Sequence, residues 1–196
     1  AACGDFRTGA SFQVALQRMT LAGGTDSTWS PDSAHLCVGW VDGELPGWDR
    51  DGGGGAFVGW ADGRRSDADI FVQRLTSGGA VAPGWATGGI PLCTAPGSQY
   101  QLAMAPDGAA GALVVWTDFR SGGIGRIFAQ RILASGTTAA GCPDGGLGVG
   151  STGADQSSPS VVADGSGGAL IAWQERRDSL PDVFALRVMP EGIVDP

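Results

Sequence analysis

The stretch Ser160-Val-Val-Ala-Asp164-Gly-Ser-Gly-Gly-Ala-Leu-Ile-Ala-Trp173-Gln-Glu-Arg-Arg177 decides the fold. Two short runs rich in apolar residues, 160–163 and 169–173, flank a turn of Asp and Gly residues. Glycine supplies the positive φ that tight hairpin turns require, so this stretch predicts two antiparallel strands joined by a hairpin. Helix is disfavoured along the whole chain, because 35 of the 196 residues are Gly and a further 11 are Pro.

The same pattern recurs along the chain at a shift of 56 or 57 residues. Asp-Gly stands at 51, 107 and 164, and a five-residue apolar segment ending in Arg stands at 14–18, 70–74, 127–131 and 183–187. Trp29 aligns with Trp85, and Cys37 aligns with Cys93. Coincidences at one fixed period indicate an internal repeat. We therefore interpret residues 1–196 as one repeat domain, with a partial unit at 1–42, full units at 43–98 and 99–155, and a partial unit at 156–196.

Each unit is expected to form four short antiparallel strands. The first precedes Asp-Gly, the second ends at the Trp, the third is the segment ending in Arg, and the fourth lies around Trp85 to Cys93 in the second unit. In the third strand, the period-2 pattern places Phe and Gln on one face and Ile and Arg on the other. Four-stranded units of this length, roughly 3.5 of them, indicate an all-β, β-propeller-like array of blades. A parallel β-solenoid is the alternative, although its rungs are usually shorter.

The repeat resembles one found in large exported bacterial proteins of the β-propeller kind. The resemblance rests on Gln-x-x-Pro at 156–159, Asp-Gly-x-Gly-Gly-Ala at 164–169, Trp-x-Glu-x-Arg at 173–177 and the segment 183–187, with their counterparts in earlier units. It implies an extracellular or cell-surface module with no activity attached. This chain departs from the pattern at Cys142, which stands in the place of Trp29 and Trp85, and at Leu186, which replaces a Gln.

Composition narrows the functional classes. The chain has 17 Asp, 3 Glu and 12 Arg but no Lys, and its net charge is −8. Nucleic-acid binding needs clustered cations, so it is excluded as an expectation. No apolar run is long enough to insert into a membrane. Four cysteines in such a chain fit a secreted or cell-surface protein, and their three pairings remain open.

Acidic residues that recur in every unit are expected to be structural, because a catalytic site is needed only once. We predict ion pairs that lock strand ends, with Arg74, Arg131 and Arg187 as further partners of the same acids. A glycoside hydrolase would require one acidic pair to differ from the others, and none does. We therefore expect no catalytic residues and no enzyme. The predicted structural set is Asp62, Arg64, Asp118, Arg120, Glu175, Arg177 and the tryptophans Trp60, Trp116 and Trp173.

Residues that interrupt the repeat are the candidates for binding. Aromatic side chains beside carboxylates can stack on a sugar ring and accept hydrogen bonds from its hydroxyls. This reasoning selects Trp40, Asp42, Glu44, Trp48 and Tyr100, although the two tryptophans would equally fill a gap between blades. The strand-joining loops 64–69, 121–126 and 176–182 vary in sequence and are expected to share one rim.

No cofactor is required by this sequence. Calcium is the one metal considered, because closely spaced carboxylates stand on Gly-rich loops at Asp49, Asp51, Asp67 and Asp69. Turn chemistry alone accounts for Asp51, since its counterparts at 107 and 164 lack a second Asp two residues earlier.

The expected function is a non-enzymatic module for binding, adhesion or scaffolding, with a glycan or a protein as ligand. Copies of the chain could also associate to complete a ring, because about 3.5 units are fewer than a propeller needs. The alternatives are a lectin-like propeller and a sialidase-like or lyase-like enzyme acting on carbohydrate.

Overall fold

The computed structural model describes residues 2–5, 13–29, 34–36, 47–150 and 153–189. This part of the chain is all-β: it contains fourteen strands and no helix, so it has no helix that could cross a membrane. The strands form four separate sheets in which every pairing is antiparallel. The prediction of an all-β, antiparallel fold is confirmed.

The four sheets follow one another in chain order. The first sheet contains β1 (Ala2–Asp5), β2 (Gln13–Leu16) and β3 (Ala34–His35), and the second contains β4 (Gly47–Arg50), β5 (Ala56–Asp62), β6 (Asp69–Leu75) and β7 (Ile90–Cys93). The third sheet contains β8 (Gln99–Pro106), β9 (Ala112–Asp118), β10 (Arg126–Ile132) and β11 (Leu147–Val149). The fourth contains β12 (Asp155–Ala163), β13 (Ala169–Arg176) and β14 (Pro181–Val188).

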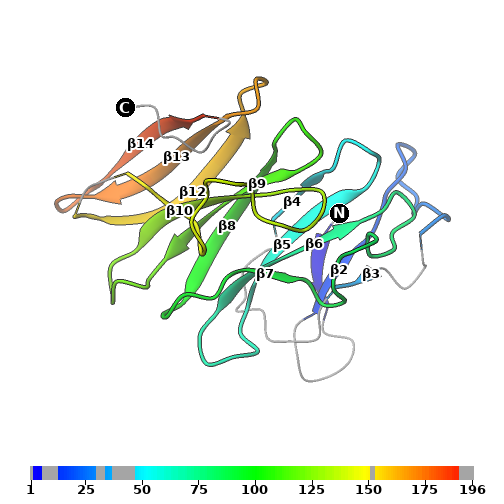
Figure 1. Cartoon of the computed structure of the whole chain (residues 1–196), viewed down its shortest axis with the longest axis horizontal. Coiled ribbons are helices and arrows are strands. Elements are labelled where there is room, and N and C mark those ends of the chain that lie inside the picture. Colours follow the sequence, from blue (N-terminus) through cyan, green and yellow to red (C-terminus); the bar gives the residue numbers. More distant parts are fainter. Residues whose placement is uncertain (1, 6–12, 30–33, 37–46, 151–152, 190–196) are drawn as a thin grey trace.

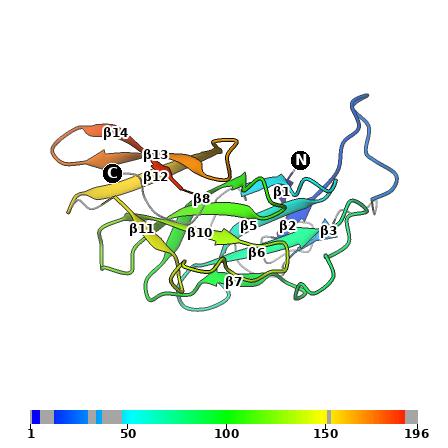
Figure 2. The ribbon, with the colours of Figure 1, turned by 45° about the horizontal axis from the view of Figure 1, so that its top comes forward.

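The sheets pack face to face in a row, with one apolar cluster between each neighbouring pair. Figures 1 and 2 show this order, from the blue first sheet at one end to the orange and red fourth sheet at the other. Val14 and Leu16 of the first sheet meet Trp60 of the second, Phe57 of the second shares a cluster with Val114 of the third, and Val115 of the third shares one with Ile171 of the fourth.

Each sheet therefore has two distinct faces. We call the face turned toward the next sheet in chain order the forward face, and the opposite face the rear face. On β6, Ile70 belongs to the cluster shared with the third sheet, whereas Phe71 belongs to the cluster shared with the first. The predicted alternation of Ile and Phe along the third strand of each unit is thus confirmed.

The Asp-Gly turns close the first hairpin of the second, third and fourth sheets, and they lie along the upper edge in Figure 1. In the second sheet, one oxygen of the Asp51 carboxylate accepts hydrogen bonds of 2.8 Å from the amides of Gly53 and Gly55. Gly52 and Gly54 have φ of +76° and +88°, in the left-handed region that favours glycine. Aspartate and glycine are therefore required together at this turn.

The first strand of the fourth sheet begins earlier than the predicted 160–163. Strand β12 starts at Asp155 and has an irregularity in register between Ser157 and Ser160. Its first residues bond to the preceding sheet: Asp155 accepts from the amide of Gly125 at 2.8 Å, and the Gln156 amide donates to the Gly125 carbonyl at 2.9 Å. Residues before the apolar run are extended because they join two sheets.

Candidate ligand-binding cleft

One cluster of four residues recurs in the second, third and fourth sheets. In the third sheet, Asp118 accepts hydrogen bonds from the indole of Trp116 at 3.0 Å and from Nε of Arg120 at 2.9 Å. The Trp116 ring stacks on Phe128 with centroids 6.2 Å apart, and the Arg120 guanidinium lies 3.8 Å above the Phe128 ring centre. The equivalent clusters are Trp60, Asp62, Arg64, Phe71 and Trp173, Glu175, Arg177, Phe184.

In each cluster, the tryptophan and the arginine hold the acid through hydrogen bonds. The predicted ion pairs Asp62–Arg64, Asp118–Arg120 and Glu175–Arg177 are all present, and the three acids are almost completely buried. Burial alone would raise the pKa of the Asp62 carboxyl, but hydrogen bonds from Arg64 and Trp60 outweigh it and hold that pKa below its usual value. The sequence pattern did not identify the phenylalanines as members of the cluster.

The second set of arginines has different partners from those predicted. Arg74 does not bind Asp62; its guanidinium bonds to the turn carboxylate of Asp51 at 2.9 Å. Arg131 binds Asp107 at 2.7 Å and Arg187 binds Asp164 through Nε at 2.8 Å in the same way. The prediction was wrong because these arginines lie at the end of the sheet that carries the Asp-Gly turn. The Trp-x-Asp-x-Arg cluster lies at the opposite end of the same sheet.

The calcium candidates lie at the two ends of β5. Asp51 has both oxygens engaged, by Arg74 and by the turn amides, and Asp49 accepts from the amide of Arg50 at 2.6 Å. Asp67 accepts from the amide of Gly97 at 3.2 Å. Over the described ranges, His, Cys, Asp and Glu side chains nowhere gather in groups of three or more that suit a metal ion.

Asp69 is the exception among these carboxylates. It is buried, its Oδ2 has no hydrogen-bond partner, and the nearest cation is Arg65, whose Nε lies 3.9 Å away. Burial raises the pKa of Asp69 above its usual value, with the neighbouring carboxylates Asp62 and Asp67 adding to the effect. The equivalent position in the third sheet is occupied by Arg126.

A cleft of about 680 Å³ opens between the first sheet and the β4–β5 hairpin of the second. Trp48 lines it and is 49% exposed, although it stands in the middle of a strand. Trp29 and Met19 come from the first sheet's side, and the glycines of the Asp51 turn form part of the other wall. Of the two predicted binding residues that the structure describes, Trp48 and Tyr100, only Trp48 lines this cleft.

The side chains equivalent to Trp48 in the third and fourth sheets are less exposed than Trp48. Met104 and Val161 stand at the place of Trp48 in the third and fourth sheets. Met104 is buried against the second sheet, where a Cβ added to Gly59 would lie 2.9 Å from its sulfur, and strands β4 and β8 are in contact. In the described part of the first sheet, β1 is the edge strand.

Two arginines line the cleft. Arg18 corresponds to Arg74, but it binds Asp26 at 3.3 Å and the Ser77 carbonyl at 3.2 Å instead of a turn aspartate. Arg50 is exposed, and its guanidinium meets no carboxylate among the described residues. Hydrogen bonds from Thr28 hold the pKa of Asp26 below its usual value. The charge of Arg18 is therefore balanced by Asp26, whereas Arg50 has no such ion pair among the described residues.

The other predicted binding residues do not join this cleft. Tyr100, on β8, packs edge-on against Phe119 with ring centroids 6.2 Å apart and does not line the cleft. Trp40, Asp42 and Glu44 lie outside the described residues. The loops that join β5 to β6, β9 to β10 and β13 to β14 occupy the same position in their sheets, as the repeat implies.

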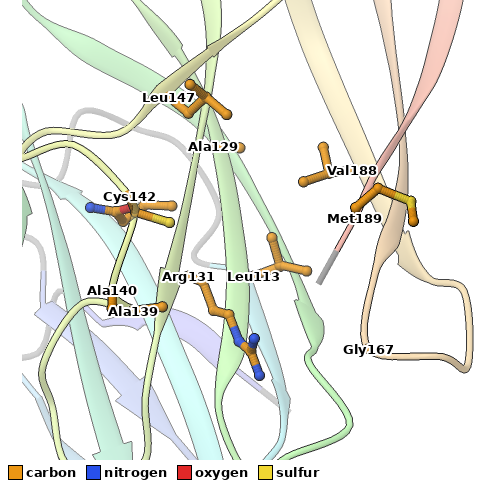
Figure 3. A pocket seen from close by; sticks show the side chains of 11 residues that line it. Leu113, Ala129, Arg131, Ala139, Ala140, Cys142, Leu147, Gly167, Val188 and Met189 are labelled. Carbon is orange, nitrogen blue, oxygen red and sulfur yellow. The ribbon is translucent and has the colours of Figure 1, made fainter. Parts of the chain in front are cut away.

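A small pocket marks the place where Cys142 replaces tryptophan (Figure 3). Trp29 and Trp85 each reach into the next sheet and donate their indole N–H to a backbone carbonyl, of Ser77 at 2.8 Å and of Ala134 at 3.0 Å. Cys142 has no such reach, and a cavity of about 20 Å³ remains beside it, lined by Leu113 and Ala129 of the third sheet and by Val188 and Met189. The third-to-fourth sheet interface therefore lacks the tryptophan link at this position.

Of the four cysteines, the structure describes the side chains of Cys93 and Cys142, and both are free thiols. Cys93 is buried, with its sulfur 3.3 Å from Nη2 of Arg120 and 3.7 Å from Oδ2 of Asp118. Burial raises the pKa of the Cys93 thiol to about 11. The thiol is therefore protonated and unreactive at neutral pH.

No protein-family model matches this chain, and no curated protein sequence matches it. Among solved structures, the chain is similar to the crystal structure of an endo-arabinase from Bacteroides thetaiotaomicron. The superposition covers 94% of this chain and 68% of the other, with 15% sequence identity and a TM-score of 0.43. A likeness of this degree assigns neither a fold family nor an activity to this chain.

Proposed function

We propose that this chain is a non-enzymatic, exported repeat module of the β-propeller kind that binds a saccharide in the Trp48 cleft. The observation that carries the proposal is the exposure of Trp48 in a large cleft, where the equivalent side chain in the third sheet is covered. Large exposed aromatic side chains in concave sites are unusual unless a ligand uses them. An adhesion or scaffolding module would use the same cleft to hold its ligand.

A propeller arrangement is supported by the order of the sheets. Each four-stranded sheet is an antiparallel meander, and successive sheets pack face to face through equivalent residues. The first and fourth sheets lie at opposite ends of the row, so closure of a ring requires something between them.

The absence of catalysis is supported by the state of the acids. Asp62, Asp118 and Glu175 are bonded to tryptophan and arginine in the same manner. A general acid or a nucleophile would need an environment that differs from that of its counterparts. The test is to incubate the protein with oligogalacturonate and with a neutral oligosaccharide and to measure new reducing ends. Activity above that of a boiled sample would overturn the proposal that the chain is not an enzyme.

The chemistry of the cleft indicates the class of saccharide. The Trp48 ring offers an apolar face to the C–H groups of a pyranose. The guanidinium group of Arg50 suits a carboxylate, which arginine binds through two parallel hydrogen bonds. An acidic saccharide such as an oligouronate fits both features, whereas a neutral saccharide would use the tryptophan alone.

The test is calorimetric titration of the protein with oligogalacturonate and with a neutral oligosaccharide of the same length. We expect oligogalacturonate to bind, and Trp48→Ala to weaken binding at least tenfold, which corresponds to about 1.4 kcal/mol. Leu180→Ala, which removes an exposed side chain from the β13–β14 loop, is the control and should bind as the parent does. Equal binding by Trp48→Ala, or no binding of either saccharide, would contradict the proposal.

A further inference from the structure

A second hollow lies on the other side of the Asp51 turn, between this turn and the Asp107 turn of the third sheet. Its volume is about 400 Å³, and we call it the turn hollow. The Asp-Gly turns lie along one edge of the row of sheets (Figure 1), so the Trp48 cleft and the turn hollow, which both border the Asp51 turn, lie at this edge. The turn hollow is lined by Gly52, Gly53 and Arg74 of the second sheet and by Pro106, Gly108 and Ala110 of the third.

The ridge between the cleft and the turn hollow is low. Gly52 lines both spaces, so they meet at the Asp51 turn. Between Asp51 and Ala56 the turn consists of four glycines, which leave the ridge without side chains. A Cβ added to Gly52 would have no atom within 4 Å, so this part of the ridge faces open space. Because the Asp51 carboxylate holds the amides of Gly53 and Gly55, the ridge is preformed, and a ligand chain can cross it without displacing a side chain.

The turn hollow differs from the cleft in its charge. Its ionised side chains, Asp51 and Arg74, bind each other at 2.9 Å, and Arg74 also donates to the Ala134 carbonyl at 3.1 Å. The rest of the lining is glycine backbone, Pro106 and Ala110. Such a surface suits the C–H and hydroxyl groups of a sugar ring, whereas the Trp48 cleft adds the guanidinium of an arginine.

The backbone of Ala110 gives an independent reason to expect a ligand in the turn hollow. Its φ is +64°, in the left-handed region, whereas the residues at its position in the second and fourth sheets are Gly54 and Gly167, with φ of +88° and +91°. An alanine in this conformation is strained by about 1–2 kcal/mol. Strain of this kind is typical of ligand sites. A ligand that packs on Ala110 would explain why this turn carries alanine where the other two carry glycine.

We propose that one saccharide chain crosses the Asp51 turn and occupies the Trp48 cleft and the turn hollow together. The inference rests on the proposed function of the cleft and names its ligand more closely, as an extended chain of several sugar rings. Each of the two spaces alone lies within the range of about 300–1,000 Å³ that small-ligand sites occupy. Rings held in the two spaces belong to one molecule, so binding in the first raises the effective concentration at the second.

The experiment is calorimetric titration of the chain with digalacturonate and with hexagalacturonate. We expect hexagalacturonate to bind at least tenfold more tightly. A hexamer contains about five overlapping disaccharides, so a site confined to the Trp48 cleft would gain only about fivefold from this statistical factor. A larger gain requires contacts outside the cleft.

Gly108→Asp and Gly165→Asp form a matched pair of variants that locate these contacts. Both glycines follow the turn aspartate of their sheets, have φ of +75° and +79°, and would place a Cβ in open space. Aspartate is among the few residues that adopt this conformation readily. Gly108 lines the turn hollow, whereas Gly165 lines neither space. We expect Gly108→Asp to weaken hexagalacturonate binding at least fivefold, because like charges repel, and to bind digalacturonate as the parent does. Gly165→Asp should bind both saccharides as the parent does.

The outcomes separate this inference from the proposed function. Binding of neither saccharide, or binding that Trp48→Ala leaves unchanged, would contradict the function of the cleft and this inference with it. Binding of both saccharides that depends on Trp48 but differs by fivefold or less would overturn the inference alone. Tight hexagalacturonate binding that Gly108→Asp retains, or that Gly165→Asp weakens equally, would also overturn it, because the extra contacts would then lie outside the turn hollow.

Discussion

Replacing Trp85 by alanine tests whether tryptophan links hold the second and third sheets together. Trp85 is buried, lies edge-on to Phe57 with ring centroids 5.8 Å apart, and donates to the Ala134 carbonyl. Truncating a buried tryptophan to alanine costs about 3–5 kcal/mol. The hydrogen bond accounts for about 1 kcal/mol of this sum, since Arg74 still donates to the same carbonyl. For a chain of this length, we expect the melting temperature to fall by about 10 °C.

The matched control is Cys142→Ala, at the equivalent position of the third unit. Cys142 is partly exposed, lines a cavity and makes no hydrogen bond to the described residues of the next sheet, so its truncation should cost less than about 1 kcal/mol. Trp85→Phe keeps an aromatic ring but removes the N–H group, and we expect an intermediate loss of about 1–2 kcal/mol. Urea unfolding followed by far-ultraviolet circular dichroism measures all three variants without relying on tryptophan emission. Equal losses for Trp85→Ala and Cys142→Ala would refute the reasoning.

Three further outcomes follow from the charged and sulfur-bearing groups. Asp107→Asn should cost about 3 kcal/mol at pH 7, because it breaks a buried ion pair with Arg131. Burial would raise the pKa of Asp107, but its hydrogen bonds hold that pKa below the usual value. The folded state therefore gains stability from the carboxylate above about pH 4 and loses it as pH falls. A difference in urea midpoint between the parent and Asp107→Asn that does not narrow in acid would contradict this. Asp69→Asn should stabilise the chain by about 1 kcal/mol at neutral pH, because it removes a buried charge whose Oδ2 lacks a hydrogen bond. Since the folded-state pKa of Asp69 is raised, that gain should shrink in acid, and a variant less stable than the parent at pH 7 would count against it. At pH 8, iodoacetamide should modify Cys142 much faster than Cys93, and peptide mass spectrometry can measure both rates. Rapid labelling of Cys93 in the folded chain would show that its thiol is accessible and would contradict this expectation.

The repeat made much of the fold predictable. Asp-Gly turns, period-2 alternation and the fixed spacing led to antiparallel sheets and to the Asp118–Arg120 type of ion pair, because both partners lie within three residues of each other. The partner of Arg74 was assigned wrongly because Asp51 lies 23 residues away. Such a pair depends on the register of three strands, which the sequence pattern does not specify.

The cleft was only partly predictable. Interruption of the repeat selected Trp48, which lines the cleft, and also Tyr100, which packs against Phe119. The difference between them depends on which neighbouring strand covers each side chain. Arg18 and Arg50 were not selected, because that reasoning looked for aromatic and acidic residues and because Arg18 occupies the place of the structural Arg74.

The carbonyls of Ser77 and Ala134 each receive an arginine and a tryptophan from the preceding sheet. Every such link joins sheets that are neighbours in the chain, so the energy of the molecule is close to a sum of unit terms and nearest-neighbour terms. The number of sheets is then free to vary. Deleting or duplicating one whole unit of 56 or 57 residues would leave each remaining link intact, so gene duplication can lengthen such a protein without redesigning its interior.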